Sequence, residues 1–347
     1  MLAELALAVL IVALSAYAVL GGADFGAGFW DLTAGGAERG ARLRGLVKHS
    51  MGPVWEANHV WLVVVLVILW TCFPHAFGPL METLYTPLFL AAVGIIGRGA
   101  AFGLRGEAAT ISEARVLGAT FALSSLLTPF FFGCAAGALA SGAVPADGDP
   151  SQPFASWTSP TALLIGSLAV AAGAYVSAVF LAADARRLEM PDLADAFRRR
   201  ALAAAAVTGA IAVGGLAVIE ADAPSLYEGL TSGGGLVAVV GSAIAGLGTI
   251  ALVWRGRFGV ARLTSALAVG AVVVGWALAQ KPDFLPGELT LDEAAAGDAT
   301  LIATLIALAV ALAVIVPSLA LLFKLTLGGR LEEPYHPIGA SGGEEGR

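Results

Sequence analysis

The last long apolar stretch of the chain, residues 299–324, reads ATLIATLIALAVALAVIVPSLALLFK and carries no charge before Lys324. A helix rises about 1.5 Å per residue, so about 20 apolar residues cross the roughly 30 Å hydrocarbon layer of a bilayer. This stretch therefore predicts a membrane-spanning helix. The same criterion predicts eight more, nine in total, at 3–22, 56–77, 79–104, 116–140, 160–183, 200–221, 234–254 and 259–280. The second and third spans are expected to join through a short turn at 74–79.

The composition also indicates a chain whose solvent is largely lipid. Apolar residues make up 58% of its 347 residues and charged residues 13%, whereas a soluble domain carries roughly 25% charged residues. The mean hydropathy is +0.84. A water-soluble fold could not cover so much apolar surface, which excludes a soluble enzyme, a nucleic-acid-binding protein and a disordered chain. Cys72 and Cys134 lie in apolar runs and predict neither a disulfide framework nor a metal cluster.

The basic residues predict how the spans are oriented. Alternate loops carry 18 of the 19 Lys and Arg residues, with Arg98 and Arg105 marking the cytoplasmic end of the third span, and the opposite loops carry only Lys281 and a group of acidic residues. The positive-inside rule then places the N-terminus outside and the C-terminus in the cytoplasm. The first span follows Glu4 and no basic segment, so we expect a retained helix and not a signal peptide.

Polar residues gather where the first span ends and the second begins. Glu56 and His59 are three residues apart and share a helix face, and Asp24 reaches the same depth from the first span. Ionisable groups at such positions are costly, which favours a functional role. Together with Asn58 they could form a proton relay, because carboxylates and imidazoles exchange protons near neutral pH. The alternatives are a capped helix start for Glu56, suited to the helix dipole, and a place at the water boundary for Asp24.

Aromatic residues and glycines surround this cluster. Trp30, Trp55 and Trp61 are expected at one level of the membrane, and an interfacial aromatic belt is their simplest interpretation. Gly26 and Gly28 are too sparse for a phosphate-binding loop. They predict close helix packing or a bend after the first span.

Metal and haem sites have little support in this sequence. Glu56-x-x-His59 is half of a di-iron pattern that needs a second copy on another helix, and the chain has one copy. The four histidines do not supply two haem ligands at one depth on facing spans, which leaves a five-coordinate haem on His59 as the alternative. On the opposite side, His75, Glu82 and Tyr85 form a second polar group, for which interfacial solvation is expected.

Residues 23–28 read ADFGAG, and residues 52–61 read GPVWEANHVW. The first segment resembles the G-F-D-[LM]-G-x-G element of subunit II of the cytochrome bd-type quinol oxidases, and the second resembles its A-P-x-W-D-G-N-[EQ]-x-W element. The spacing of the two elements, the Arg98 and Arg105 pair and the segment 289–300 are also similar to this family. The resemblance covers most of the chain, and the first hundred residues carry its specific part.

The resemblance implies two four-helix bundles plus one peripheral helix. It implies a heterodimer in a bacterial or archaeal cell membrane with subunit I, which holds the haems (haem b, with haem d as a further candidate) and the quinol site. This chain would bind no cofactor itself. A small accessory subunit and membrane lipid are further candidate partners, and nucleic acid is not.

The resemblance also implies roles for individual residues. Glu56 occupies the position of the acid linked to proton uptake, with Asp24, Asn58 and His59 as further proton-transfer candidates. The matched structural positions are Trp55, Trp61, Gly26, Gly28 and Arg98. The chain departs from the family pattern by having Glu56 for Asp, Ala57 for Gly, His59 for Glu or Gln, and Gly21 where an acid is frequent. A proton path rerouted through His59 is therefore one expectation.

The sequence thus predicts the haem-free second subunit of a quinol:oxygen oxidoreductase that supports assembly and conducts protons from the cytoplasm toward the haems of subunit I. Its expected parts are residues 1–140, the first four-helix bundle with the proton-uptake motif; 141–325, the second bundle with the last helix; and 326–347, a mobile cytoplasmic tail. A secondary transporter or ion channel with Asp24 and Glu56 as ion ligands is an alternative, although such sites favour the bilayer midplane and repeated halves. A purely structural assembly subunit is another.

Overall fold

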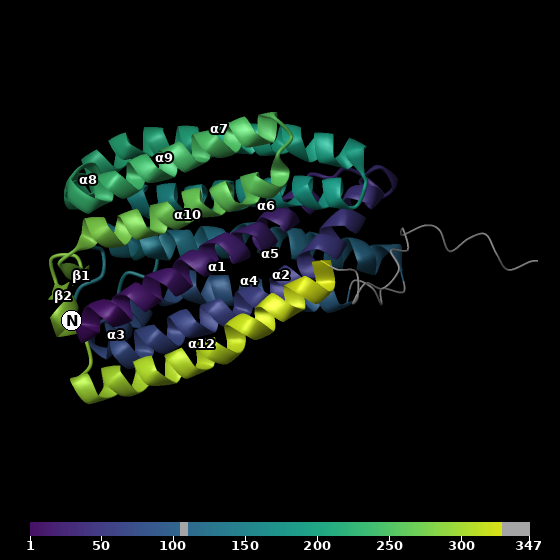
Figure 1. Ribbon diagram of the computed structural model, residues 1–347. Coiled ribbons are helices and arrows are strands. Elements are labelled where there is room, and N and C mark those ends of the chain that lie inside the picture. Colours follow the sequence, from purple (N-terminus) through teal and green to yellow (C-terminus); the bar gives the residue numbers. More distant parts are fainter. Residues whose placement is uncertain (105–109, 328–347) are drawn as a thin grey trace, which may run out of the picture.

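A computed structural model of the chain consists mainly of long helices that run side by side (Figure 1). The structure describes residues 1–104 and 110–327, apart from the side chains of residues 37–39, 51–57, 111, 323 and 326–327. The long helices are α1 (Leu2–Leu32), α2 (Ala37–Cys72), α4 (Tyr85–Leu104), α5 (Ile111–Ala140), α6 (Pro160–Arg187), α7 (Pro191–Asp222), α9 (Gly233–Trp254), α10 (Phe258–Gln280) and α12 (Asp298–Leu327). The short elements are α3 (Pro74–Thr83), η1 (Ala155–Trp157), α8 (Pro224–Thr231), β1 (Asp283–Leu285), β2 (Leu289–Thr290) and α11 (Leu291–Ala294).

Eight helices in the described part of the chain are long and apolar enough to cross a membrane, namely α1, α4, α5, α6, α7, α9, α10 and α12. A ninth span requires that Asn58–Cys72 of α2 and the whole of α3 count as one, although the two segments are bent by 117° at their junction. The helical membrane architecture is therefore as expected. The expected number of nine spans depends on how this bent pair is counted.

The junction of α2 and α3 differs from the short turn expected at 74–79. Phe73 leaves the helical conformation, with φ −131° and ψ 55°, and Pro74 starts α3, where its missing N–H is harmless. Helix α3 runs through Pro79 to Thr83, so the next long helix begins at Tyr85 and not at residue 79. The hydropathy criterion placed this start too early because α3 is itself rich in apolar residues.

Helices α1 and α2 also extend beyond the ranges expected from hydropathy. Helix α1 continues to Leu32, ten residues past the predicted end at 22, so the segment with Gly26 and Gly28 is helical and not a bend. Helix α2 begins at Ala37, so residues 52–56 do not form the start of a helix. The interpretation of Glu56 as a helix-start cap is therefore wrong. Hydropathy missed both extensions because they contain polar residues. They are helical nevertheless, because the hydrogen bonds within a helix satisfy its backbone in lipid as well as in water.

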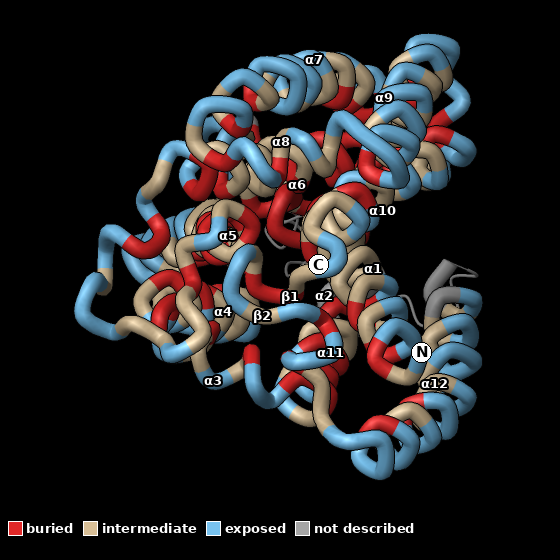
Figure 2. Tube along the Cα trace, turned by 90° about the vertical axis from the view of Figure 1, so that its left-hand side faces the viewer, coloured by how far each residue is buried: buried red, intermediate tan, exposed pale blue. Residues whose placement is uncertain are grey.

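The long helices form two packed groups. Helices α1, α2, α4 and α5 contact one another, as do α6, α7, α9 and α10, and the two groups meet mainly where α6 packs on α1 and α5. Figure 2 shows α12 at the edge of the molecule, where it contacts α2 and, to a smaller extent, α1. Only 6% of the most apolar window of α12 is buried. Helix α12 is therefore peripheral in this chain.

Glycines bring α1 and α6 close together at the seam between the groups. A Cβ atom added to Gly26 would lie 2.0 Å from the carbonyl oxygen of Gly173 and 2.7 Å from Cβ of Ser177. Gly22 and Gly173 also face each other, with a Cβ on Gly173 only 3.0 Å from the Gly22 carbonyl oxygen. Small residues allow such close backbone contact in membranes, so the close-packing interpretation of Gly26 holds.

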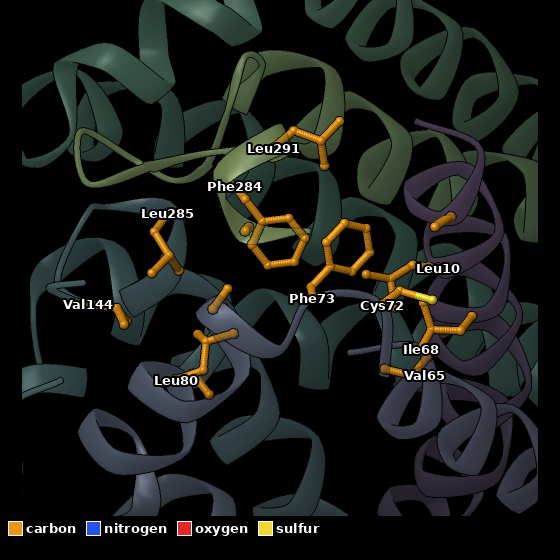
Figure 3. Close-up of a cluster of buried hydrophobic side chains, with 14 of the residues drawn as sticks. Leu10, Val65, Ile68, Cys72, Phe73, Leu80, Val144, Phe284, Leu285 and Leu291 are labelled. Atoms are coloured by element: carbon orange, nitrogen blue, oxygen red, sulfur yellow. The ribbon is translucent and has the colours of Figure 1, made fainter. Parts of the chain in front are cut away.

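The end of the molecule that contains residue 1 is closed by the loops after α2 and α10. The Phe73 and Phe284 rings stack with centroids 4.6 Å apart, and Leu285 and Val144 are fully buried beside them (Figure 3). Strands β1 and β2 form a small antiparallel hairpin, the departure from an all-α fold. At the opposite end α6 and α9 finish, and Arg186, Arg187, Arg255 and Arg257 are exposed there. We call this opposite end the basic end.

Candidate functional site

Asp24 lies inside the first helix group and joins three helices. It projects from α1, within the last third of that helix toward the basic end, and is only 1% exposed. Asn58 of α2 donates a hydrogen bond from Nδ2 to Asp24 Oδ2 at 2.9 Å. Arg98 of α4 donates from Nη2 to Asp24 Oδ1 in an ion pair, and also to the Asp24 main-chain oxygen at 3.0 Å. The structure thus brings the predicted residues Asp24, Asn58 and Arg98 together.

Arg98 is not at the end of its span, where the sequence analysis placed it. It is 2% exposed, and its Nη1 donates to Ser125 Oγ of α5 at 3.0 Å. Ser125 in turn donates to the Phe121 main-chain oxygen at 2.6 Å. The guanidinium carbon lies 4.5 Å from the centre of the Phe121 ring and 5.1 Å from that of Phe25. A buried charge needs such partners, because leaving it uncompensated costs about 3–5 kcal/mol.

Glycines give the cluster room for its polar side chains. A Cβ atom on Gly28 would lie 2.1 Å from Ser125 Oγ, and one on Gly94 would lie 2.2 Å from Thr128 Oγ1. Larger residues at these two positions would displace the hydroxyls of α5. The glycines of the matched motif therefore make room for the polar cluster as well as bringing helices together.

Several buried polar atoms at this site have no hydrogen-bond partner among the residues that the structure describes. They include Asn58 Oδ1 and Arg98 Nε, with Thr128 Oγ1 on the neighbouring turn of α5 from Ser125. Buried polar atoms are usually satisfied by protein or by ordered water. The cluster therefore offers both a donor and an acceptor to water molecules.

The other predicted residues of α2 differ from Asn58 in where their side chains lie, or their side chains are not described. The side chains of Glu56 and Trp55 are outside the described residues, although both positions belong to the helical backbone of α2. His59 is half-buried, and as the residue after Asn58 it points about 100° away around the helix. Trp61 is half-buried and packs against the core that includes Ile68, and its buried Nε1 has no hydrogen-bond partner in the described part of the chain.

Trp30 is part of the core and not of an interfacial belt. It is 9% exposed and donates from Nε1 to the Ala174 main-chain oxygen at 2.9 Å. Its ring makes edge-on contacts with Phe29 and Phe197. The belt interpretation fails for Trp30 because α1 continues into the seam between the two helix groups.

Further ion pairs at the basic end were missed by the sequence analysis. Asp184, 6% exposed on α6, pairs with Arg262 Nη2 of α10 at 2.6 Å and with Arg187 at 3.7 Å. Asp31 pairs with Arg44 Nε at 2.8 Å. The sequence contained a signal for Asp184, an acid in the last turn of an apolar helix, but its partner Arg262 is 78 residues away, beyond α7, α8 and α9. These pairs fix helix ends, whereas the Asp24 cluster joins helices of the first group away from their ends.

The second polar group at the opposite end is a surface feature. His75, Glu82 and Tyr85 are all exposed. The buried neighbour Thr83 accepts a hydrogen bond from the Asp149 main-chain N–H at 2.9 Å, which ties the loop after α5 to α3. Within the described ranges, no three His, Cys, Asp or Glu side chains are grouped as a metal site would require.

Comparisons with known proteins agree on one family. The family model described as "Cytochrome bd terminal oxidase subunit II" matches residues 2–326. The "Cytochrome bd ubiquinol oxidase subunit 2" of Bacillus subtilis (strain 168) is 30% identical over 114 residues, which is 33% of this chain and 33% of that relative. The alignment therefore spans about a third of the curated relative. A chain of the bd oxidase structure from Geobacillus thermodenitrificans has the same fold, with a TM-score of 0.74 and 23% identity over 94% of this chain and 99% of that chain.

Proposed function

Because this chain belongs to the family of cytochrome bd terminal oxidase subunit II, we propose that it is the haem-free second subunit of a quinol:oxygen oxidoreductase. Its partner would be the subunit that holds the haems and the quinol site, and the two would form a heterodimer in the cell membrane. The chain would cross the membrane nine times, with α2 and α3 counted as one bent span. The concentration of arginines at the basic end supports placing that end in the cytoplasm.

We further propose that the chain conducts protons from the cytoplasm toward the haems of its partner. The observation that carries this proposal is the buried carboxylate of Asp24 bound to Asn58, near the basic end of the first helix group. Buried ionisable groups within a membrane are costly and mark sites of function. Asn58 stands two residues after Glu56 on α2, so the matched family position lies within one helical turn of the cluster along the chain.

The contacts suggest a division of labour within this cluster. Both carboxylate oxygens of Asp24 are engaged, one by Arg98 and the other by Asn58. Asp24 and Arg98 would therefore hold the Asn58 amide in one orientation, with its Oδ1 available to a water molecule. Glu56 and His59 would then be the groups that gain and lose the transferred proton, since carboxylic acids and imidazoles do so readily near neutral pH.

Two substitutions of Glu56 test the proposal in the purified complex. Glu56→Gln removes the exchangeable proton but keeps the size of the side chain, and we expect quinol-driven oxygen consumption to fall about tenfold or more. Glu56→Asp keeps the carboxylic acid and should retain most of the activity. The optical spectrum of the haems serves as the control and should be the same in both variants.

Other outcomes would favour the rival functions. Equal oxygen consumption in wild type and Glu56→Gln would contradict the proton path through Glu56. Loss of haem in Glu56→Gln would indicate an assembly role for this region. Ion transport by the purified chain alone in liposomes would favour a transporter or channel.

A further inference from the structure

The basic end of the second helix group carries arginines that form no ion pair with the carboxylates of the described residues. Arg199, Arg255 and Arg257 are exposed and, within the part of the chain that the structure describes, form no ion pair. The acid nearest to Arg199 along the chain is Asp195, which is exposed one turn before it on α7. This differs from Arg44, Arg98 and Arg262, each of which has a carboxylate partner. The surface that carries Arg199, Arg255 and Arg257 therefore has an excess of positive charge.

Arg198 and Trp254 join the two helices that carry this charge. Arg198 of α7 donates from Nη2 to the Trp254 main-chain oxygen of α9 at 2.5 Å, and its guanidinium carbon lies 5.9 Å from the centre of the Trp254 ring. Arg199 follows Arg198 on α7, and Arg255 follows Trp254 directly after the end of α9. The contact thus brings together the two chain segments that carry the exposed residues Arg199 and Arg255.

A tight turn holds the third arginine nearby. Helix α9 ends at Trp254, and Gly256 then adopts φ +70°, with Gly256 N–H donating to Val253 O at 3.1 Å and Arg257 N–H donating to Leu252 O at 2.9 Å. Glycine adopts this positive-φ conformation without the steric cost that a Cβ atom brings. The chain reverses at this turn and enters α10 directly. Arg255 and Arg257 therefore both lie at the basic end. In Figure 1 this turn and the start of α7 lie at the end opposite to residue 1.

The surface beside these arginines is apolar and exposed along the whole of α9. Trp254 is 67% exposed, and Val237, Ile244 and Leu247 on the same helix are 72%, 65% and 67% exposed. An exposed tryptophan at the end of such a helix suits the boundary between acyl chains and headgroups. This surface therefore matches the parts of one phospholipid molecule. The arginines suit its charged headgroup, the Trp254 ring suits the boundary region, and the apolar side chains of α9 suit its acyl chains.

We propose that Arg198, Arg199, Trp254, Arg255 and Arg257 form a binding site for one anionic phospholipid, which we call the α7–α9 lipid site. The phosphate group and headgroup would lie among Arg199, Arg255 and Arg257, and the acyl chains would follow the exposed face of α9. Basic surfaces between membrane helices on the cytoplasmic side recognise anionic headgroups in this way. The site is remote in sequence from Asp24 and Glu56, so the proposal does not depend on the proton path.

Native mass spectrometry of the purified complex with its haem-bearing partner tests this site. Phosphatidylglycerol, and separately phosphatidylcholine with the same acyl chains, would be titrated into the detergent solution. We expect the wild-type complex to bind phosphatidylglycerol more tightly, and the double variant Arg199→Gln/Arg255→Gln to bind it about 25-fold more weakly, at about fivefold per arginine. Lys281→Gln is the matched control, because Lys281 is an exposed cation at the opposite end, and it should bind phosphatidylglycerol as the wild type does.

Any of the following four results would overturn the proposal. Equal affinity of wild type and double variant for phosphatidylglycerol would show that the arginines do not bind the lipid. Equal affinity for the two lipids would show that acyl chains alone determine binding. Displacement of the lipid signal by millimolar inorganic phosphate would indicate a site for free phosphate. A polypeptide that co-purifies with the wild type and is lost from the double variant, without a difference in lipid binding, would indicate a protein partner. An unchanged haem spectrum verifies that the variants are folded.

Discussion

The ion pair of Asp24 and Arg98 is the centre of the contacts between polar side chains that link helices of the first group. It links α1 to α4, and the hydrogen bonds to Asn58 and Ser125 extend the link to α2 and α5. Four helices are therefore joined through one buried polar cluster. Because hydrocarbon offers no alternative partner for any of these groups, the cluster also specifies the rotation of each helix about its own axis.

Replacement of Arg98 by methionine leaves Asp24 buried without its cation. Breaking one side of a buried ion pair costs about 3–5 kcal/mol, so we expect the Arg98→Met complex to unfold at a clearly lower temperature than the wild type. The double variant Asp24→Asn/Arg98→Met removes both charges and should recover much of that loss. Thermal unfolding of the purified complexes measures these differences. An Arg98→Met complex as stable as the wild type would contradict the importance assigned to the pair.

Single-residue features were predictable from the sequence only where a local pattern carried them. The meeting of Asp24 and Asn58 followed from their equal depth on neighbouring spans. The burial of Arg98 did not, because a count of loop charges treats every arginine near the end of a span as exposed. Its partners Asp24 and Ser125 are 74 and 27 residues away in the chain, and no local pattern connects them.

At the scale of helices, the seam between α1 and α6 depends on the absence of side chains. Gly26→Ala would place a methyl group against the backbone of Gly173, which cannot rotate away as a side chain can. Overpacking of this kind costs about 1–3 kcal/mol. We expect a lower unfolding temperature for Gly26→Ala. The control is Gly103→Ala on α4, where nothing lies within 4 Å of an added Cβ, and this variant should be as stable as the wild type or slightly more stable.

The short helix α11 has a capping box whose strength depends on pH. Hydrogen bonds from the main-chain N–H and the side chain of Thr290 hold the pKa of Glu293 below its ordinary value of 4.5. Because the folded-state pKa is lowered, the stabilisation is present above the unfolded-state pKa and is lost as the pH falls through the folded-state pKa. Hydrogen-exchange protection factors of residues 291–296 should therefore decrease below about pH 4.5.

The substitution Glu293→Gln isolates this effect. Glutamine can still accept the hydrogen bonds of Thr290, but it has no charge to lose. We expect lower protection of residues 291–296 at neutral pH in this variant, with little change on acidification. The same acid-induced decrease in both proteins would show that another group is responsible.

The extents of the helices were less predictable than their existence. Hydropathy detects the part of a helix that faces lipid, and it therefore located α9 and α12 well. It ended α1 too early because residues 23–31 are buried against protein and include two acids. It divided α3 between the second and third predicted spans, 56–77 and 79–104, because α3 is apolar, although α3 is bent by 117° from Asn58–Cys72.

At the scale of the whole molecule, the orientation in the membrane follows from where the charges lie. A cysteine introduced at Lys281 should react with a membrane-impermeant maleimide added outside intact cells. One introduced at Lys324 should react only after the membrane is opened. The native Cys72 and Cys134 are buried, so the background should be low. Labelling in the reverse pattern would invert the topology and place the basic end outside.

The central claim is that protons for oxygen reduction enter through this chain from the basic end. The most direct measurement records pH inside proteoliposomes that contain the complex in one orientation, with the basic end facing the lumen, during quinol-driven turnover. We expect the lumen to become alkaline as oxygen is consumed. Glu56→Gln should slow alkalinisation and oxygen consumption by the same factor, whereas Glu56→Asp should slow neither. Lumenal alkalinisation at the wild-type rate in Glu56→Gln, or proton uptake from the outer compartment alone, would contradict the central claim.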